Sequence, residues 1–131
     1  MSHILIIDDD PGVRSLATAV LHKAGFKTSE ANNADDGLIV FRATRPDLVI
    51  TDILMPDKDG YEFLVELRRE FPTARIIAMS GMISRTQALR VAGLLGARTV
   101  IPKPFANHEL LEAVQEALGE AGKAESGNLE N

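Results

Sequence analysis

Residues 47–60 read Asp-Leu-Val-Ile-Thr-Asp-Ile-Leu-Met-Pro-Asp-Lys-Asp-Gly, and this stretch decides the fold. The run from Leu48 to Thr51 favours β structure and is too short for a helix between Pro46 and Pro56, so it predicts a buried strand. Asp52 then stands at the C-terminal end of that strand. In a parallel α/β sheet the ligand-binding loops leave from this edge, although a single Asp there also commonly caps a turn.

Strand and helix patterns alternate along the whole chain. Short apolar runs predict strands at 3–7, 27–31, 48–51, 74–79 and 98–101. Apolar residues at helical spacing, Leu16 and Ile39 among them, predict helices at 11–24, 34–44, 61–71, 84–95 and 107–118. Parallel strands joined by right-handed crossover helices form a doubly wound α/β domain of three layers.

Length and composition limit what the chain can be. Its 131 residues fit one domain, which we expect at 1–118, and the loss of apolar periodicity after it predicts a disordered tail or linker at 119–131. A net charge of −5 argues against a nucleic-acid or anionic-membrane surface. Without cysteine there is no disulfide framework, and the short apolar N-terminal run predicts neither a signal peptide nor a membrane span. We therefore expect a cytoplasmic protein.

Three adjacent carboxylates, Asp8, Asp9 and Asp10, follow the first predicted strand directly. They repel one another unless a cation lies between them, and a divalent ion is the obvious candidate. A helix N-terminus also favours Asp, through capping and the helix dipole. That alternative explains Asp10 well and the other two carboxylates less well, so both interpretations stay open.

Ser80 and Lys103 follow the fourth and fifth predicted strands. Each alone could be a turn hydroxyl or a solvated lysine, but a parallel sheet gathers them at one edge with Asp8, Asp9 and Asp52. Mg²⁺ takes about six oxygen ligands and uses one or two carboxylates together with a phosphate. An ionised Asp attacks phosphorus once cations neutralise the incoming group. The pattern predicts phosphoryl transfer onto Asp52, with Mg²⁺, Lys103 and Ser80 on the phosphoryl oxygens.

Four motifs together resemble the receiver domain of bacterial two-component response regulators. They are Ile-Leu-Ile-Ile-Asp-Asp-Asp-Pro at 4–11, Asp-Ile-Leu-Met-Pro-Asp-Lys-Asp-Gly at 52–60, Met-Ser-Gly at 79–81 and Lys-Pro-Phe at 103–105. The resemblance runs from about His3 to Leu118 and lies in the order and spacing of all four motifs. It implies a flavodoxin-like, five-stranded parallel sheet of order 2-1-3-4-5 with helices on both faces.

The resemblance also implies roles for the residues at this edge. Asp52 would accept a phosphoryl group from the phosphohistidine of a sensor kinase. Asp8, Asp9 and Asp52 would bind Mg²⁺, with Mn²⁺ as an alternative, and the Leu54 backbone carbonyl would complete the protein ligands. The domain would assist its own phosphotransfer and dephosphorylation without being an enzyme for other substrates.

Activation would involve residues on the last two strands. By the same resemblance Ser80 contacts the phosphoryl group and shifts on activation, while Lys103 pairs with that group. The Lys103–Pro104 peptide is expected to be cis, an isomer open at low cost to X–Pro bonds. Val100 stands where receivers commonly carry Tyr or Phe, so the usual aromatic switch is in doubt, and the loop and helix after Ser80 are expected to transmit the signal.

Partners follow from the resemblance in general terms. They are a sensor histidine kinase or phosphotransfer protein, and a downstream target or dimer partner on the face built by the helix at 84–95, the strand at 98–101 and the helix at 107–118. We expect this chain itself to contact neither nucleic acid nor membrane. Whether it acts alone or as part of a longer protein is left open, as is the cognate kinase.

Two other functions would use some of the same residues. In a haloacid-dehalogenase-like phosphatase, Asp8 would be the nucleophile and Asp10 the acid/base. Gly12 stands where that family has Thr or Val, no second acidic pair follows Lys103, and Asp52 would have no role. The second rival is a receiver-like adaptor that works without phosphorylation, which the unusual Val100 keeps open.

Leu54 and Met82 generate a prediction about the lifetime of the phosphorylated state. Both are apolar where receivers border the path of hydrolytic water, so neither side chain orients an attacking water. We expect slow self-dephosphorylation in the wild type and a shorter acyl-phosphate half-life in the double variant Leu54→Asn, Met82→Glu. A half-life in the double variant as long as the wild type's, or longer, would contradict this.

Overall fold

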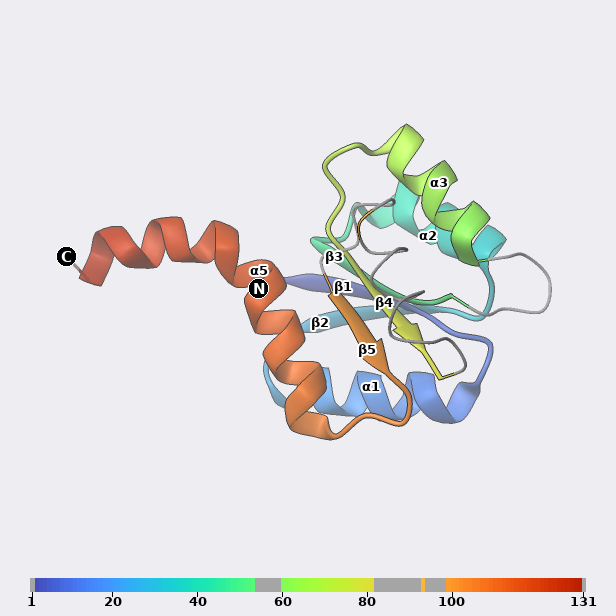
Figure 1. The fold of residues 1–131 in the computed structure, drawn as a ribbon, viewed down its shortest axis with the longest axis horizontal. Coiled ribbons are helices and arrows are strands. Elements are labelled where there is room, and N and C mark those ends of the chain that lie inside the picture. The colour runs from blue at the N-terminus through green and yellow to red at the C-terminus, as the bar shows by residue number, and fades with distance from the viewer. Residues whose placement is uncertain (1, 54–59, 82–92, 94–98, 131) are drawn as a thin grey trace.

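Five short parallel strands form one sheet in the computed structural model, which describes residues 2–53, 60–81, 93 and 99–130 (Figure 1). The strands are β1 (His3–Ile7), β2 (Lys27–Ala31), β3 (Leu48–Asp52), β4 (Ile76–Ser80) and β5 (Thr99–Pro102). Their order in the sheet is β2-β1-β3-β4-β5, and every neighbouring pair is parallel. The predicted flavodoxin-like topology is confirmed.

Helices cover both faces of the sheet. They are α1 (Pro11–Lys23), α2 (Ala34–Thr44), α3 (Gly60–Glu70) and α5 (Asn107–Glu130). Figure 1 shows α1 and α5 on one side of the strands and α2 and α3 on the other. The helix predicted at 84–95 lies outside the described residues except for residue 93.

Alternation along β1 divides the interior into two cores. Ile4 and Ile6 belong to the core beneath α1 and α5, whereas Leu5 and Ile7 belong to the core beneath α2 and α3. All four side chains are fully buried. Successive side chains of a strand point to opposite faces, so a strand covered on both sides must be apolar throughout. β1 therefore lies between the two helical layers, and the acidic loop follows it directly.

Gly37 brings α2 close to the end of β1. A Cβ atom at this position would lie 2.5 Å from Cδ1 of Ile7, a distance that real Cβ contacts essentially never show. The missing side chain therefore lets the helix pack directly on the residue that precedes Asp8.

Two expected inward-facing residues were predicted wrongly. Ile39 is 61% exposed and Leu16 is 45% exposed. Other apolar residues of these patterns are confirmed as inward, since Leu38 and Phe41 in α2 and Leu21 in α1 are buried. A helix turns about 100° per residue, so an apolar residue next to a buried one leaves the inward stripe unless the helix is covered more widely.

The last helix continues to Glu130, and its predicted end at Leu118 was wrong. Residues 119–130 contain no proline to end the helix, and their alanine, glutamate and lysine residues favour it, whereas Gly119, Gly122 and Gly127 oppose it. In Figure 1 this part of α5 extends away from the sheet. Loss of apolar periodicity thus marked where packing on the sheet ends rather than where the helix ends. The division between a domain at 1–118 and a tail at 119–131 stays a prediction.

None of the helices in the described part of the chain is long and apolar enough to cross a membrane.

Phe63 and Ile39 provide a matched test of the two-layer core. Phe63 on α3 is fully buried, whereas Ile39 on α2 is 61% exposed. Phe63→Ala should lower the free energy of unfolding by about 3–5 kcal/mol because it leaves a cavity. Ile39→Ala should change it by less than about 0.5 kcal/mol. Urea denaturation measures both, and similar losses in the two variants would contradict this description of the core.

Candidate functional site

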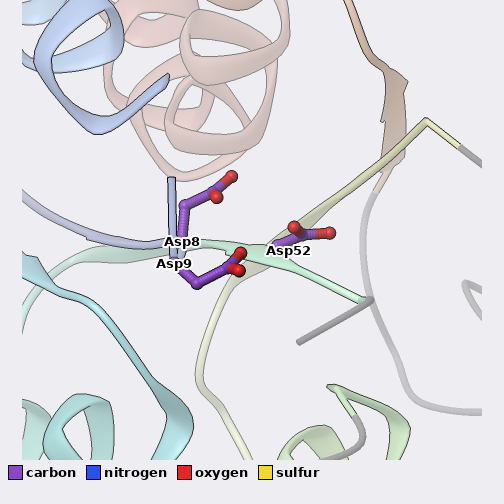
Figure 2. Close-up of side chains that lie close together, drawn as sticks. All are labelled: Asp8, Asp9 and Asp52. Carbon is purple, nitrogen blue, oxygen red and sulfur yellow. The ribbon is translucent and has the colours of Figure 1, made fainter. Parts of the chain in front are cut away.

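Three carboxylates converge at the C-terminal edge of the sheet. Asp8 follows β1, Asp9 follows it in the loop, and Asp52 ends the neighbouring strand β3. One carboxylate oxygen from each lies within 4.8 Å of the others (Figure 2). Asp8 is fully buried and Asp52 is 5% exposed, while Asp9 is exposed to solvent. Asp9 thus faces solvent, whereas Asp8 and Asp52 are shielded from it.

Asp10 has a separate, structural role. It is the N-cap of α1, and its Oδ1 accepts a hydrogen bond of 2.8 Å from the backbone N–H of Gly12. Capping of this kind satisfies a donor that the helix itself leaves unpaired. Both interpretations of the acidic run therefore hold, each for different residues: capping for Asp10, and the carboxylate cluster for Asp8 and Asp9.

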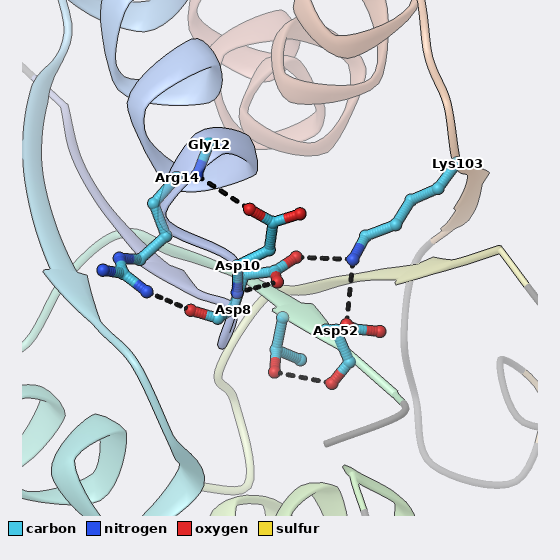
Figure 3. Close-up of polar contacts among 7 residues, drawn as sticks. Asp8, Asp10, Gly12, Arg14, Asp52 and Lys103 are labelled. Atoms are coloured by element: carbon cyan, nitrogen blue, oxygen red, sulfur yellow. Dashed lines mark hydrogen bonds and ion pairs between the residues drawn. The ribbon is translucent and has the colours of Figure 1, made fainter. Parts of the chain in front are cut away.

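Lys103 reaches into the cluster from the loop after β5. Its Nζ lies 2.6 Å from Oδ2 of Asp8 and 2.8 Å from Oδ2 of Asp52 (Figure 3). Burial alone would lower the pKa of this ammonium, but the hydrogen bonds and negative charges of Asp52 and Asp8 outweigh burial and raise its pKa. Lys103 therefore stays protonated and neutralises part of the buried negative charge. The peptide bond that follows it, Lys103–Pro104, is cis, the isomer that the resemblance implied.

Ser80 ends β4 beside the cluster. It is 5% exposed, and its Oγ has no hydrogen-bond partner within the described part of the chain. Its backbone carbonyl accepts a 2.9 Å hydrogen bond from the N–H of Lys103, which ties the ends of β4 and the β5 loop together. The next residue is Gly81, where a Cβ would lie 3.3 Å from Cβ of Lys103. Glycine therefore permits the close approach of the lysine loop to the serine.

Val100 lies on the same face of the sheet as Ser80. It pairs with Ala78 of β4, two residues before Ser80, and is partly buried against the core under α2 and α3. Alternate residues of a strand point to the same face of the sheet, so the side chains of Ser80 and Val100 lie on one side of it. Leu54 and Met82 lie outside the described residues.

Arg14 is the residue that the sequence analysis missed. Its Nη1 donates a hydrogen bond to the backbone carbonyl of Asp8 (Figure 3). Its Nε lies 3.3 Å from Glu30 of β2. The available signal was an arginine four residues after the helix cap, Asp10. Such an arginine on the first turns of a helix is usually a solvated residue, so the pattern alone gave it no role.

The donor set suits a hard divalent cation. It consists of carboxylate oxygens from Asp8, Asp9 and Asp52, the ligand type that Mg²⁺ and Mn²⁺ share. Partial neutralisation by Lys103 does not exclude a second cation, because three carboxylates face one ammonium. The fit to such a cation rests on these three aspartates alone. The predicted Leu54 carbonyl ligand lies outside the described part of the chain.

The family model for the response regulator receiver domain matches residues 4–115. The chain belongs to the response regulator receiver domain family. Receiver domains bind Mg²⁺ and interact with histidine kinases and effector domains, and this chain is a phosphorylation-dependent signalling switch of the same kind. It is a signalling domain, and the phosphatase alternative is not favoured.

Individual relatives agree. Sporulation initiation phosphotransferase F of Bacillus subtilis is 35% identical over 115 residues, which cover 88% of this chain and 92% of that protein. A probable transcriptional regulator, ycf27, of Porphyridium aerugineum is 34% identical and covers 95% of this chain. The chain spans 51% of that protein, so it has about half the length of this relative.

Solved structures of receiver domains are also similar to this chain in fold. A CheY-like receiver domain protein from Methanospirillum hungatei superposes with a TM-score of 0.87 at 29% identity, covering 95% of this chain and 98% of that one. The receiver domain of NtrX from Brucella abortus gives a TM-score of 0.83 at 30% identity, covering 88% and 98%.

Lys103→Met tests the electrostatics of the receiver site. Removing the ammonium leaves two buried carboxylates facing each other, so we expect the free energy of unfolding without divalent ions to fall by about 2–3 kcal/mol. This is below the range for fully buried pairs because Lys103 is 20% exposed. Lys23→Met on the exposed end of α1 is the matched control and should cost less than about 1 kcal/mol. Equal losses in thermal or urea unfolding would contradict the assigned role.

Proposed function

We propose that Asp52 accepts a phosphoryl group from the phosphohistidine of a sensor kinase or phosphotransfer protein. The observation that carries the proposal is the position of this nearly buried carboxylate between an ammonium and two further carboxylates. An oxygen of Asp52 would form a bond to phosphorus while the phosphorus–nitrogen bond of phosphohistidine breaks. The imidazole leaves and takes up a proton from solvent, so atoms and charge balance.

Asp8, Asp9 and Asp52 would hold Mg²⁺ beside the acceptor, or Mn²⁺ in its place, with the carbonyl of Leu54 as a further ligand. Their carboxylate oxygens lie within 4.8 Å of one another, which supports this assignment for the three aspartates. The chemistry that the ion supplies when bound is neutralisation of charge on the phosphoryl oxygens.

Lys103 and Ser80 would bind the phosphoryl group from the other side. The Lys103 ammonium is already 2.8 Å from Asp52, so it can pair with a phosphoryl oxygen after a small shift. Ser80 has a buried hydroxyl without a hydrogen-bond partner in the part of the chain that the structure describes. A buried hydroxyl of this kind gains a partner when a phosphoryl oxygen arrives, which supports its role as the residue that moves on activation.

Val100 changes how that movement would be transmitted. A valine has one stiff side-chain torsion and cannot swing inward as an aromatic ring does. We therefore propose that the segment after Ser80 carries the change to a face that includes β5 and α5, together with the helix predicted at 84–95. A downstream target or a dimer partner would bind there. The response that phosphorylation produces would depend on that partner. The cytoplasmic location stays a prediction.

The lifetime of the phosphorylated state is the second part of the proposal. The domain would assist hydrolysis of its own acyl phosphate, and the apolar Leu54 and Met82 would make that hydrolysis slow.

The test is to locate the acyl phosphate after incubation with acetyl phosphate and Mg²⁺. Asp52→Asn should abolish labelling, because an amide is not a nucleophile toward phosphorus. Asp8→Asn should slow labelling, since it removes a metal ligand, but should leave the label on Asp52. Peptide mapping after borohydride reduction identifies the labelled residue.

Each rival predicts a different result. A label on Asp8 that survives Asp52→Asn would support the phosphatase alternative. Partner binding that is the same with and without beryllofluoride would favour an adaptor that works without phosphorylation.

A further inference from the structure

We propose that Arg14 is a positioning residue for the divalent-cation site, acting through the peptide group between Asp8 and Asp9. The inference rests on the proposed function only in taking these carboxylates as the cation ligands. It concerns a residue that touches neither the ion nor the phosphoryl group.

Every polar atom of Asp8 is held in place. Its N–H donates to the carbonyl of Ala31 at 3.1 Å, and its Oδ1 accepts from the N–H of Asp10 at 2.9 Å. Its Oδ2 pairs with Lys103 at 2.6 Å, and its carbonyl oxygen accepts from the Arg14 guanidinium. The contacts of the Asp8 N–H and Oδ2 fix Asp8 itself, and the Asp10 N–H bond restrains the peptide after Asp9. Arg14 supplies the contact on the peptide between Asp8 and Asp9.

That peptide determines where Asp9 points. A peptide unit is planar, so fixing the Asp8 carbonyl also fixes the N–H and Cα of Asp9. The Asp9 carboxylate is exposed to solvent, and yet it lies with the two buried carboxylates in one cluster, as Figure 2 shows. An exposed side chain depends on its backbone for such a position. Arg14 therefore brings the third carboxylate to the cation site.

Arg14 is itself built into the fold. Its side chain is 18% exposed, its Nε lies 3.3 Å from Glu30 on the edge strand β2, and its backbone N–H donates to the carbonyl of Asp10 at 3.1 Å. An exposed ion pair alone would contribute little to stability. A guanidinium that bonds two groups on two different elements instead acts as a rigid brace, because its donors form a planar fork.

Charge and geometry predict opposite effects of removing this side chain. A positive charge near the site repels a second cation, so loss of charge alone would tighten Mg²⁺ binding. Loss of the brace would loosen the Asp9 carboxylate and weaken binding. Hydrogen-bonded supports of metal ligands typically contribute roughly tenfold or more to metal affinity.

The experiment is a calorimetric titration of the full 131-residue chain with Mg²⁺ alone, with Mn²⁺ binding followed by electron paramagnetic resonance as a second readout. Arg14→Lys keeps the charge and loses the fork, and Arg14→Met loses both. We expect each to weaken Mg²⁺ binding roughly tenfold.

Arg42→Lys is the matched control. Arg42 makes a two-pronged ion pair with Glu70 between α2 and α3, with both N–O distances at 2.7 Å, away from the acidic cluster. It should bind Mg²⁺ as the wild type does. Melting temperatures without divalent ions show whether either arginine variant is generally destabilised.

A second measurement separates positioning from a merely structural effect. Labelling by acetyl phosphate in Arg14→Lys should need about ten times more Mg²⁺ for half-maximal rate, with the rate at saturating Mg²⁺ within about twofold of wild type. General destabilisation would lower the saturating rate as well, and that pattern would overturn the inference.

Other outcomes also decide it. Wild-type affinity in Arg14→Lys, tighter binding in Arg14→Met, or a wild type that binds no Mg²⁺ would each overturn the positioning role. If the wild type binds Mg²⁺ but carries no phosphoryl label on Asp52, the proposed function is contradicted. The Mg²⁺ titrations of the Arg14 variants would still test the positioning role of Arg14.

Discussion

Like-charge repulsion among Asp8, Asp9 and Asp52 is the constraint on which the rest of the site depends. Two negative charges about 5 Å apart repel by about 3 kcal/mol at an effective dielectric constant of 20, and two of these three carboxylates are buried. The fold tolerates the arrangement because Lys103 donates a hydrogen bond of 2.8 Å to Asp52 and forms an ion pair of 2.6 Å with Asp8. The negative charge that Lys103 leaves unbalanced favours a further cation at this edge, which is the basis of the proposed phosphoryl-acceptor site.

The sheet makes this arrangement rigid. Parallel strands β1 and β3 are neighbours, so their C-terminal ends place Asp8 and Asp52 side by side. Both strands are covered on two faces by helices, which prevents either carboxylate from moving away to solvent. Lys103 and Ser80 come from the other half of the sheet, and the hydrogen bond between their backbones ties the end of β4 to the loop after β5. Assembly of the site is therefore a property of the topology.

The sequence predicted the structure correctly where a residue pattern at a given position has one common structural role. Apolar runs gave all five strands, and residues at the ends of those runs gave the cluster. It failed where the outcome depended on which neighbours cover an element. Ile39 is apolar but faces solvent, because nothing in the chain's own periodicity says how wide the covered stripe of α2 is. Helix α5 runs past Leu118 because helix propensity and core packing are separate properties, and the apolar pattern reports the second.

The sequence by itself determined the parallel α/β class and the gathering of the acidic residues, Ser80 and Lys103 at one edge, because short apolar runs ending in polar residues leave few alternatives in such a sheet. The strand order followed from the resemblance of the four motifs to receiver domains. Tertiary structure alone decided that Asp10 caps α1 while Asp8 and Asp9 face Asp52, since three adjacent identical residues look alike until the chain's direction is known. It also decided the role of Arg14. Its contacts with Asp8 and with Glu30 join three elements, and only the folded chain brings these together.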